Sequence, residues 1–291
     1  MTDVLTVLNA NPAWLVGLSA LLGLLFGSFL NVVIYRLPIM METRWRTECE
    51  EMLEPGNARG DSETFNLLTP RSRCPQCGVA VSALSNVPVF SWLWLRGKCA
   101  NCRAPISVQY PTVELITGLA SAVVIAHFGA TAAGGAALIL TWALVALSGI
   151  DFNTTLLPDD ITLPLLWLGL IANLFFLYTD LQSAVLGAVF GYLSLWLVYQ
   201  GFKLITGKEG IGFGDFKLLA ALGAWLGWQY LPLVILVSSL LGAIVGISLM
   251  LILGRDRNVP IPFGPYLAFA GWICLIWGSE LNALYLGSYG G

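Results

Sequence analysis

Residues 132–151 read AAGGAALILTWALVALSGID, an apolar run that carries no charge until its last residue, Asp151. A helix needs about 20 apolar residues to cross a hydrocarbon core about 30 Å thick. The run is therefore predicted to be a transmembrane helix with an acid at its C-terminal end.

The composition extends this reading to the whole chain. Of the 291 residues, 57% are hydrophobic and 11% are charged, and the mean hydropathy is +0.79. A soluble globular domain carries about 25% charged residues, because water covers its entire surface. We therefore predict an all-α polytopic membrane protein, with the lipid bilayer as its main surroundings.

Apolar stretches long enough to approach a membrane span occur about eight times. The first is not a cleaved signal peptide, because it lacks a basic segment before it and its basic flank, Arg36, follows it. The sixth is short. The predicted spans are 12–35, 112–129, 132–150, 161–178, 183–203, 216–228, 231–253 and 263–284.

Basic residues indicate the orientation, since loops rich in Lys and Arg stay in the cytoplasm. All 14 lie in three places: between Arg36 and Arg103, between Lys203 and Lys217, and at Arg255 and Arg257. With eight spans and a periplasmic N-terminus, all three places fall on the cytoplasmic side. The opposite loops carry no Lys or Arg and hold three acids, namely Asp3, Asp180 and Glu280.

The predicted organisation has three parts. Residues 1–35 form the first transmembrane helix, and residues 36–111 form a small cytoplasmic loop domain. Within the loop domain, 44–63 are rich in Glu, Arg, Gly and Asn, so we expect a mobile insertion there. Residues 112–291 form the transmembrane core of seven helices.

Two Cys-x-x-Cys pairs lie in the loop domain. Cys74 and Cys77 form one pair, and Cys99 and Cys102 form the other. Two such turns complete a tetrahedral Zn²⁺ site, and a reducing compartment disfavours disulfides. We expect one structural zinc per chain, with redox-active or incidental thiols as the alternative. The other cysteines, at positions 49 and 274, are expected to be ordinary residues.

The chain has a single histidine, which limits the kinds of hydrolytic enzyme that it can be. The only one, His127, lies in the second span without an acidic or nucleophilic neighbour. HExxH metalloproteases and Ser–His hydrolases are therefore excluded. Carboxylates remain, and ionisable groups near membrane spans are usually functional.

Two aspartates stand out by their positions. Asp151 lies at a helix C-terminus, where the helix dipole disfavours a carboxylate. Asp215 follows a glycine-rich segment, 210–214, and lies on the same predicted membrane face. Two carboxylates in one site can share a proton and activate water, as in aspartic proteases. Asp159 and Asp160 open the fourth span, where helix capping is a sufficient explanation for one of them.

At these residues the sequence resembles the type IV prepilin peptidase family, membrane aspartyl proteases with a GxGD motif. The resemblance covers most of the chain. It includes Asp151 with 156–159, the segment 212–219 around Asp215, the cysteine-bearing stretch 71–115, the first span at 27–38 and the start of the last span at 263–266.

The resemblance implies an enzyme of the bacterial inner membrane with two activities. It would cleave type IV prepilins and type II secretion pseudopilins after a Gly at the cytoplasmic face, with Asp151 and Asp215 as catalytic residues. It would then N-methylate the new terminal residue with S-adenosylmethionine. For the methyl donor, the best candidates for contact are Gly97 and Glu114, and Glu114 has helix-dipole stabilisation as an equal alternative.

Two other functions remain open at this point. A proton-coupled transporter also uses paired acids, although nearer the middle of its spans. A non-enzymatic assembly protein would use the zinc loop to dock a partner. No nucleic-acid partner is expected.

Overall fold

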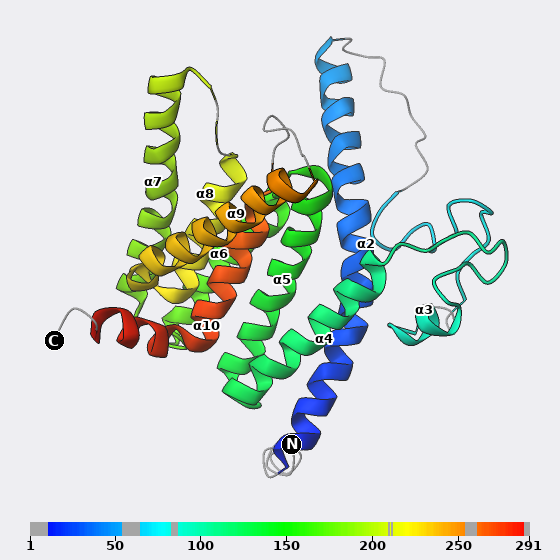
Figure 1. The fold of residues 1–291 in the computed structure, drawn as a ribbon, viewed down its shortest axis with the longest axis horizontal. Coiled ribbons are helices and arrows are strands. Elements are labelled where there is room, and N and C mark those ends of the chain that lie inside the picture. The colour runs from blue at the N-terminus through cyan, green and yellow to red at the C-terminus, as the bar shows by residue number, and fades with distance from the viewer. Residues whose placement is uncertain are drawn as a thin grey trace. The chain divides into compact units, whose positions relative to one another are not determined.

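The protein is mostly helical in the residues described by its computed structural model, which are 11–53, 65–82, 87–208, 210, 212–253 and 261–287 (Figure 1). Within these ranges the only β-pairing is two single bridges, Arg73 with Ala80 and Lys98 with Pro105. The helices are α2 (Pro12–Leu53), α3 (Phe90–Trp94), α4 (Gln109–Phe128), α5 (Ala132–Thr154), α6 (Asp159–Leu174), α7 (Leu181–Thr206), α8 (Phe213–Leu226), the 3₁₀ turn η2 (Trp228–Tyr230), α9 (Leu231–Leu253) and α10 (Gly264–Gly287).

Each of the eight predicted spans coincides with a helix in the described part of the chain, which confirms the all-α membrane class. Five helical segments there are long and apolar enough to cross a membrane: α2, α4, α5, α7 and η2 with α9. The count of eight spans is not confirmed. With 16 and 14 residues, α6 and α8 reach only about 24 and 21 Å at 1.5 Å per residue.

The chain forms two compact units, each described here by itself. One contains residues 6–126, and the other contains residues 127–291 with residues 1–5. The first unit includes α2, the cysteine-bearing loop and nearly all of α4. The second includes α5 to α10. This division follows packing, whereas the predicted boundaries at 35 and 111 follow the expected membrane surface.

In the first unit, α2 packs closely on α4 through small residues. A Cβ at Gly27 would lie 2.6 Å from the Cα of Glu114, and one at Gly23 would lie 2.5 Å from the Ser121 hydroxyl. The Asn31 side chain also donates a 3.0 Å hydrogen bond to the carbonyl of Tyr110. Small residues let helix backbones approach in a membrane, so α2 and α4 form a tight pair.

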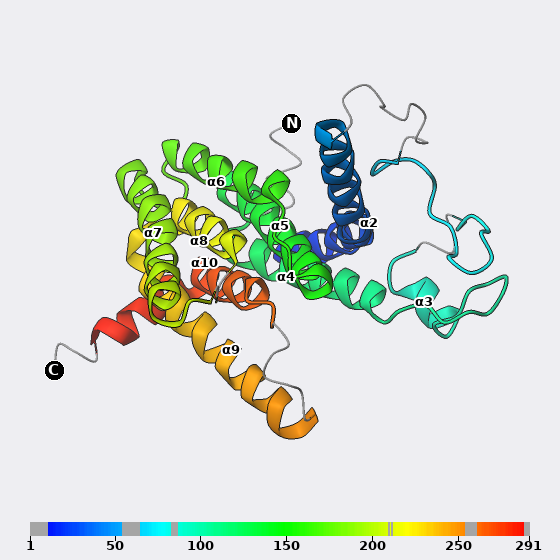
Figure 2. The ribbon, with the colours of Figure 1, turned by 90° about the horizontal axis from the view of Figure 1, so that it is seen from above.

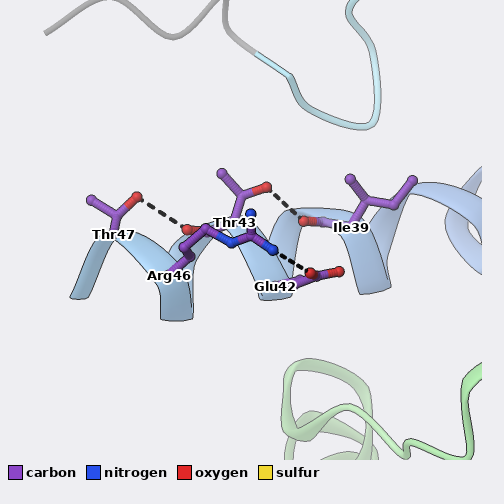
Figure 3. A network of polar contacts seen from close by, with 5 residues as sticks. All are labelled: Ile39, Glu42, Thr43, Arg46 and Thr47. Carbon is purple, nitrogen blue, oxygen red and sulfur yellow. Dashed lines mark hydrogen bonds and ion pairs between the residues drawn. The ribbon is translucent and has the colours of Figure 1, made fainter. Parts of the chain in front are cut away.

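Helix α2 continues well beyond the predicted span and ends at Leu53. Figure 3 shows why the extension stays helical: Glu42 and Arg46 form an i,i+4 ion pair of 2.8 Å, and the Thr43 hydroxyl donates to the Ile39 carbonyl. Residues 44–53 of the expected mobile insertion therefore belong to this helix. Residues 54–63 of that insertion lie outside the described residues, as do Asp3, Arg255 and Arg257.

In the second unit, α8 is the central helix. It packs against α6, α7 and α10 (Figure 2), and every residue from Leu218 to Leu226 is buried. Gly187 of α7 and Gly223 of α8 meet so closely that a Cβ on either would overlap the backbone of the other. By contrast, α9 is mostly exposed and very apolar, so lipid is its natural surroundings.

Candidate active site and metal centre

Asp151 occupies the last turn of α5. The helix begins at the N-cap Thr131, whose hydroxyl accepts from the Gly134 N–H, and ends at Thr155, which has a left-handed φ of 54°. The Thr155 N–H donates a 2.8 Å hydrogen bond to the Asp151 carbonyl, which closes the helix. The Asp151 residue itself is only 4% exposed, so its carboxylate lies inside the helical unit.

The Asp151 carboxylate is held by the first residue of α10. The Gly264 N–H donates a 2.9 Å hydrogen bond to Oδ2 of Asp151. A Cβ at Gly264 would lie 2.7 Å from the same oxygen. Glycine is therefore required for this backbone donor to come so close to the carboxylate.

Asp215 lies in the first turn of α8, where the helix dipole favours a carboxylate. It is 8% exposed, and its Oδ1 is buried without a hydrogen-bond partner among the described residues. A buried polar atom without a partner costs free energy and in a native structure points to a functional role.

The short connection from α5 to α6 packs beside the segments that carry or support the two aspartates. Its residue Leu157 lies against both Gly214, next to Asp215, and Gly264, the donor to Asp151. A Cβ would lie 2.6 Å from the Leu157 side chain at Gly214 and 3.1 Å from it at Gly264. The backbones that support the two carboxylates therefore converge on one side chain.

Asp159 and Asp160 lie in the first turn of α6, but neither occupies its N-cap, which is Pro158 with no side-chain capping bond. Asp159 instead forms a bidentate ion pair with Lys217 of α8, at 2.6 and 2.7 Å. This pair joins the start of α6 to the first turns of α8. Asp159 is thus engaged with a cation and, unlike Asp151 and Asp215, has a side chain that is about half exposed.

The four loop cysteines converge on one point. Their Sγ atoms all lie within 4.8 Å of one another, and those of Cys74 and Cys102 are 3.7 Å apart. A tetrahedron with Zn–S bonds of about 2.3 Å has edges of about 3.8 Å. The arrangement therefore fits a zinc ion bound by four thiolates.

The two cysteine turns share one backbone design. The Gly78 N–H donates to the Cys74 carbonyl, and the Arg103 N–H donates to the Cys99 carbonyl. Gly78 and Arg103 both have a left-handed φ, of 68° and 58°. Backbone N–H groups of Cys102 and Asn101 lower the pKa of the Cys99 thiol to about 6.

The two residues considered for the methyl donor lie on either side of α3. Glu114 is buried, and its Oε2 accepts a 2.7 Å hydrogen bond from the Val89 N–H just before α3. Gly97, just after α3, has a φ of 68° and packs on Trp92, 2.8 Å from where its Cβ would be. Both residues hold α3 in place.

Some important residues were not assigned a role from the sequence. Gly264 and Leu157 carry no reactive group, so only their neighbours reveal what they do. The buried Arg36 was read as an orientation signal, but its guanidinium also donates to the carbonyls of Asn66 and Pro70, at 2.8 and 2.5 Å. It therefore ties the start of the cysteine-bearing loop to α2.

Comparison with known proteins agrees with this geometry. Residues 21–128 match the bacterial peptidase A24 N-terminal domain, and residues 138–247 match the type IV leader peptidase family. The first matched segment contains the four-cysteine cluster and the helices beside it, and the second contains the two aspartate segments. No solved structure matches the chain.

Curated relatives span nearly the full length. A protein of Aeromonas hydrophila is 52% identical over 289 residues, covering 99% of this chain and 100% of its own. A protein of Stutzerimonas stutzeri is 55% identical, with 96% of each chain covered, and one of Pseudomonas aeruginosa is 54% identical, with 97% of each covered. All three are named prepilin leader peptidase/N-methyltransferase.

The fold and the site define a polytopic membrane peptidase. The chain belongs to the type IV leader peptidase family. It is a multi-pass inner-membrane enzyme with peptidase and N-methyltransferase activities, and the transporter alternative is not supported.

Proposed function

We propose that the chain removes the leader of type IV prepilins and pseudopilins by means of Asp151 and Asp215. It then N-methylates the exposed terminal residue. The observation that carries the proposal is the pair of buried carboxylates at two helix ends, whose supporting backbones meet at Leu157. The names of the full-length relatives supply the substrate class.

The chemistry follows from two carboxyls that share one proton. The ionised carboxylate takes a proton from a water molecule as its oxygen bonds to the scissile carbonyl carbon. The protonated carboxyl gives its proton to the carbonyl oxygen. The resulting tetrahedral intermediate collapses when the C–N bond breaks: the leaving nitrogen takes a proton from the carboxyl that received it from water, and the other carboxylate takes a proton back from a hydroxyl of the intermediate as the C=O bond re-forms. Oδ1 of Asp215, which has no partner among the residues that the structure describes, can take part in this exchange.

The position of the two aspartates suits a membrane-bound substrate. Asp151 lies in the last turn of α5 and Asp215 in the first turn of α8, so each is close to a helix end. A prepilin carries a basic leader before an apolar helix, so its scissile bond lies at the membrane edge. We place both aspartates and the cysteine loop on the cytoplasmic side and the N-terminus in the periplasm, in line with the distribution of Lys and Arg.

The proposed function involves two bound groups, a zinc ion and the methyl donor S-adenosylmethionine. Cys74, Cys77, Cys99 and Cys102 would hold one zinc ion, whose four protein ligands leave no open position for catalysis. Its role is therefore to fold the loop. S-adenosylmethionine, when bound, would supply an electrophilic methyl group. We place its site beside α3, where Gly97 and Glu114 fix the backbone.

Incubation of the purified protein with a prepilin tests the function. Mass spectrometry of the product should show loss of the leader after Gly. With S-adenosylmethionine present, the new N-terminus should gain one methyl group. An intact substrate with a folded, zinc-containing enzyme would contradict the peptidase assignment, and a cleaved but unmodified product would contradict the methyltransferase assignment.

A further inference from the structure

Helix α3 exposes an apolar surface that none of the described residues of its unit covers. Within this short helix Phe90 is 66% exposed, Leu93 is 59% exposed and Trp94 is 89% exposed. Large exposed apolar groups gathered in one place mark a site of contact with a partner or a membrane. The position of α3 along α4 decides between the two.

The depth of α3 follows from its hydrogen bond to α4. Helix α4 has 20 residues, which at 1.5 Å per residue give about 30 Å, the full thickness of a hydrocarbon core. Glu114 lies five residues after the start of α4 at Gln109, or about 7 to 8 Å along the helix axis. The Val89 N–H is bound to the Glu114 carboxylate, so α3 begins about 7 to 8 Å from this end of α4, within the depth of about 5–10 Å to which an interfacial helix inserts its apolar face.

The neighbouring surface of α4 is itself apolar. Leu115, Ile116 and Leu119, in the turns around and below Glu114, are between 49% and 59% exposed. In a membrane-spanning helix such side chains face lipid. Since the Val89 bond ties α3 to this level of α4, the exposed side chains of α3 continue a lipid-facing surface outward.

The backbone and the flanking charges of α3 also suit lipid. The N–H groups of Ser91, Leu93 and Leu95 donate to carbonyls one turn earlier, so they need no water. Arg96 and Lys98 follow directly and are exposed. Tryptophan favours the membrane interface, and basic residues next to it attract anionic headgroups.

We infer that α3 is an interfacial anchor, with Phe90, Leu93 and Trp94 inserted in the lipid leaflet on the side of the cysteine loop. Its partner is the lipid surface. One cysteine pair precedes α3 in the chain and the other follows it, so the anchor holds the four-cysteine module against the membrane. The inference concerns lipid contact and does not depend on which residues cleave the substrate.

A photoreactive amino acid tests the anchor in the intact protein. Benzophenone-alanine replaces Trp94 in full-length, zinc-containing protein reconstituted in phospholipid nanodiscs. After illumination, mass spectrometry detects covalent phospholipid adducts. Leu119 serves as the lipid-facing reference. Leu68 serves as the matched control, because it is 82% exposed but is expected to lie outside the lipid. It belongs to the loop that is hydrogen-bonded to Arg36, and Arg36 follows the apolar run of α2.

The expected result is phospholipid adduct at positions 94 and 119 and none above background at position 68. A second label at position 93 should also react with lipid, which guards against a local disturbance at position 94. Adduct at 119 alone, or crosslinks from both 93 and 94 to protein instead of lipid, would overturn the inference.

Discussion

At the scale of single residues, the two candidate catalytic aspartates are supported in different ways. The Asp151 carboxylate accepts a hydrogen bond from the Gly264 N–H, whereas one carboxylate oxygen of Asp215 has no hydrogen-bond partner among the described residues. This hydrogen bond to Asp151 depends on glycine at position 264, because a Cβ there would lie 2.7 Å from the Asp151 carboxylate.

Gly264→Ala tests this dependence. The added methyl group should push the Asp151 carboxylate from its place, and a displacement of about 1 Å can cost about a hundredfold in rate. We therefore expect kcat for leader removal to fall by about that factor while the protein stays folded. Gly135→Ala is the matched control, because nothing lies within 4 Å of that position and alanine favours a helix by about 0.5–1 kcal/mol. Unchanged cleavage by Gly264→Ala would remove Gly264 from the site.

Asp159→Asn tests whether this third acid takes part in catalysis. Asp159 is about half exposed and pairs with Lys217, and such pairs contribute about 0–1 kcal/mol to stability. We expect cleavage to persist, with a change in unfolding free energy of no more than about 1 kcal/mol. Loss of cleavage to the level of an Asp151 variant would instead place Asp159 in the active site.

At the scale of elements, the ends of helices matter most. The α5–α6 connection starts at Thr155, which caps the helix that carries Asp151. It leads to Asp159, which pairs with Lys217 of α8. Leu157 lies between these two points. In the other unit, Glu114 and Gly97 hold α3, and the two cysteine turns face each other across the metal centre.

The zinc module is tested by serine substitution of each of its four cysteines. Elemental analysis should give about one zinc per chain in the wild type and much less in each variant, since all four thiolates are ligands. Thermal unfolding of the unit that contains α2 and α4 should shift to lower temperature, because metal binding contributes to folding. Cys49→Ser, on the exposed extension of α2, is the control and should change neither quantity. Wild-type zinc content in all four variants would refute the site.

Gly97→Val and Glu114→Gln test whether methyl transfer is separate from hydrolysis. Valine is strained at a φ of 68° and meets Trp92, and glutamine weakens the bond to the Val89 N–H. Both changes should yield cleaved pilin with an unmethylated N-terminus. Asp215→Asn should still methylate a pilin supplied already cleaved. If Asp215→Asn loses that activity although it is folded and contains zinc, the two activities share one site.

At the scale of the whole molecule, hydropathy predicted where the helices lie, because lipid leaves few alternatives to an uninterrupted apolar helix. It did not predict the full length of α2. The extension of α2 depends on ion pairs and threonine hydrogen bonds outside the apolar run. The shortness of α8 agrees with the short sixth span expected from the sequence, and the helix ends at Gly227, which has a φ of 88°.

The candidate site was predictable to the extent that its residues carry unusual chemistry. Asp151, Asp215 and the paired cysteines stand out because acids are rare in apolar runs and Cys-x-x-Cys is a metal pattern. Gly264, Leu157 and Arg36 act through close packing or backbone contacts, which depend on segments far away in the chain. Such roles need coordinates.

The central claim, that Asp151 and Asp215 together cleave the substrate, is tested most directly by the mass of a pilin treated with single variants. Asp151→Asn and Asp215→Asn should each leave the leader in place, because asparagine cannot exchange the proton. Both proteins should remain folded and retain zinc. Asp180→Asn is the control, since asparagine caps the start of α7 as well as aspartate does, and it should release the leader at the wild-type rate. Full release of the leader by either Asp151→Asn or Asp215→Asn would contradict the account.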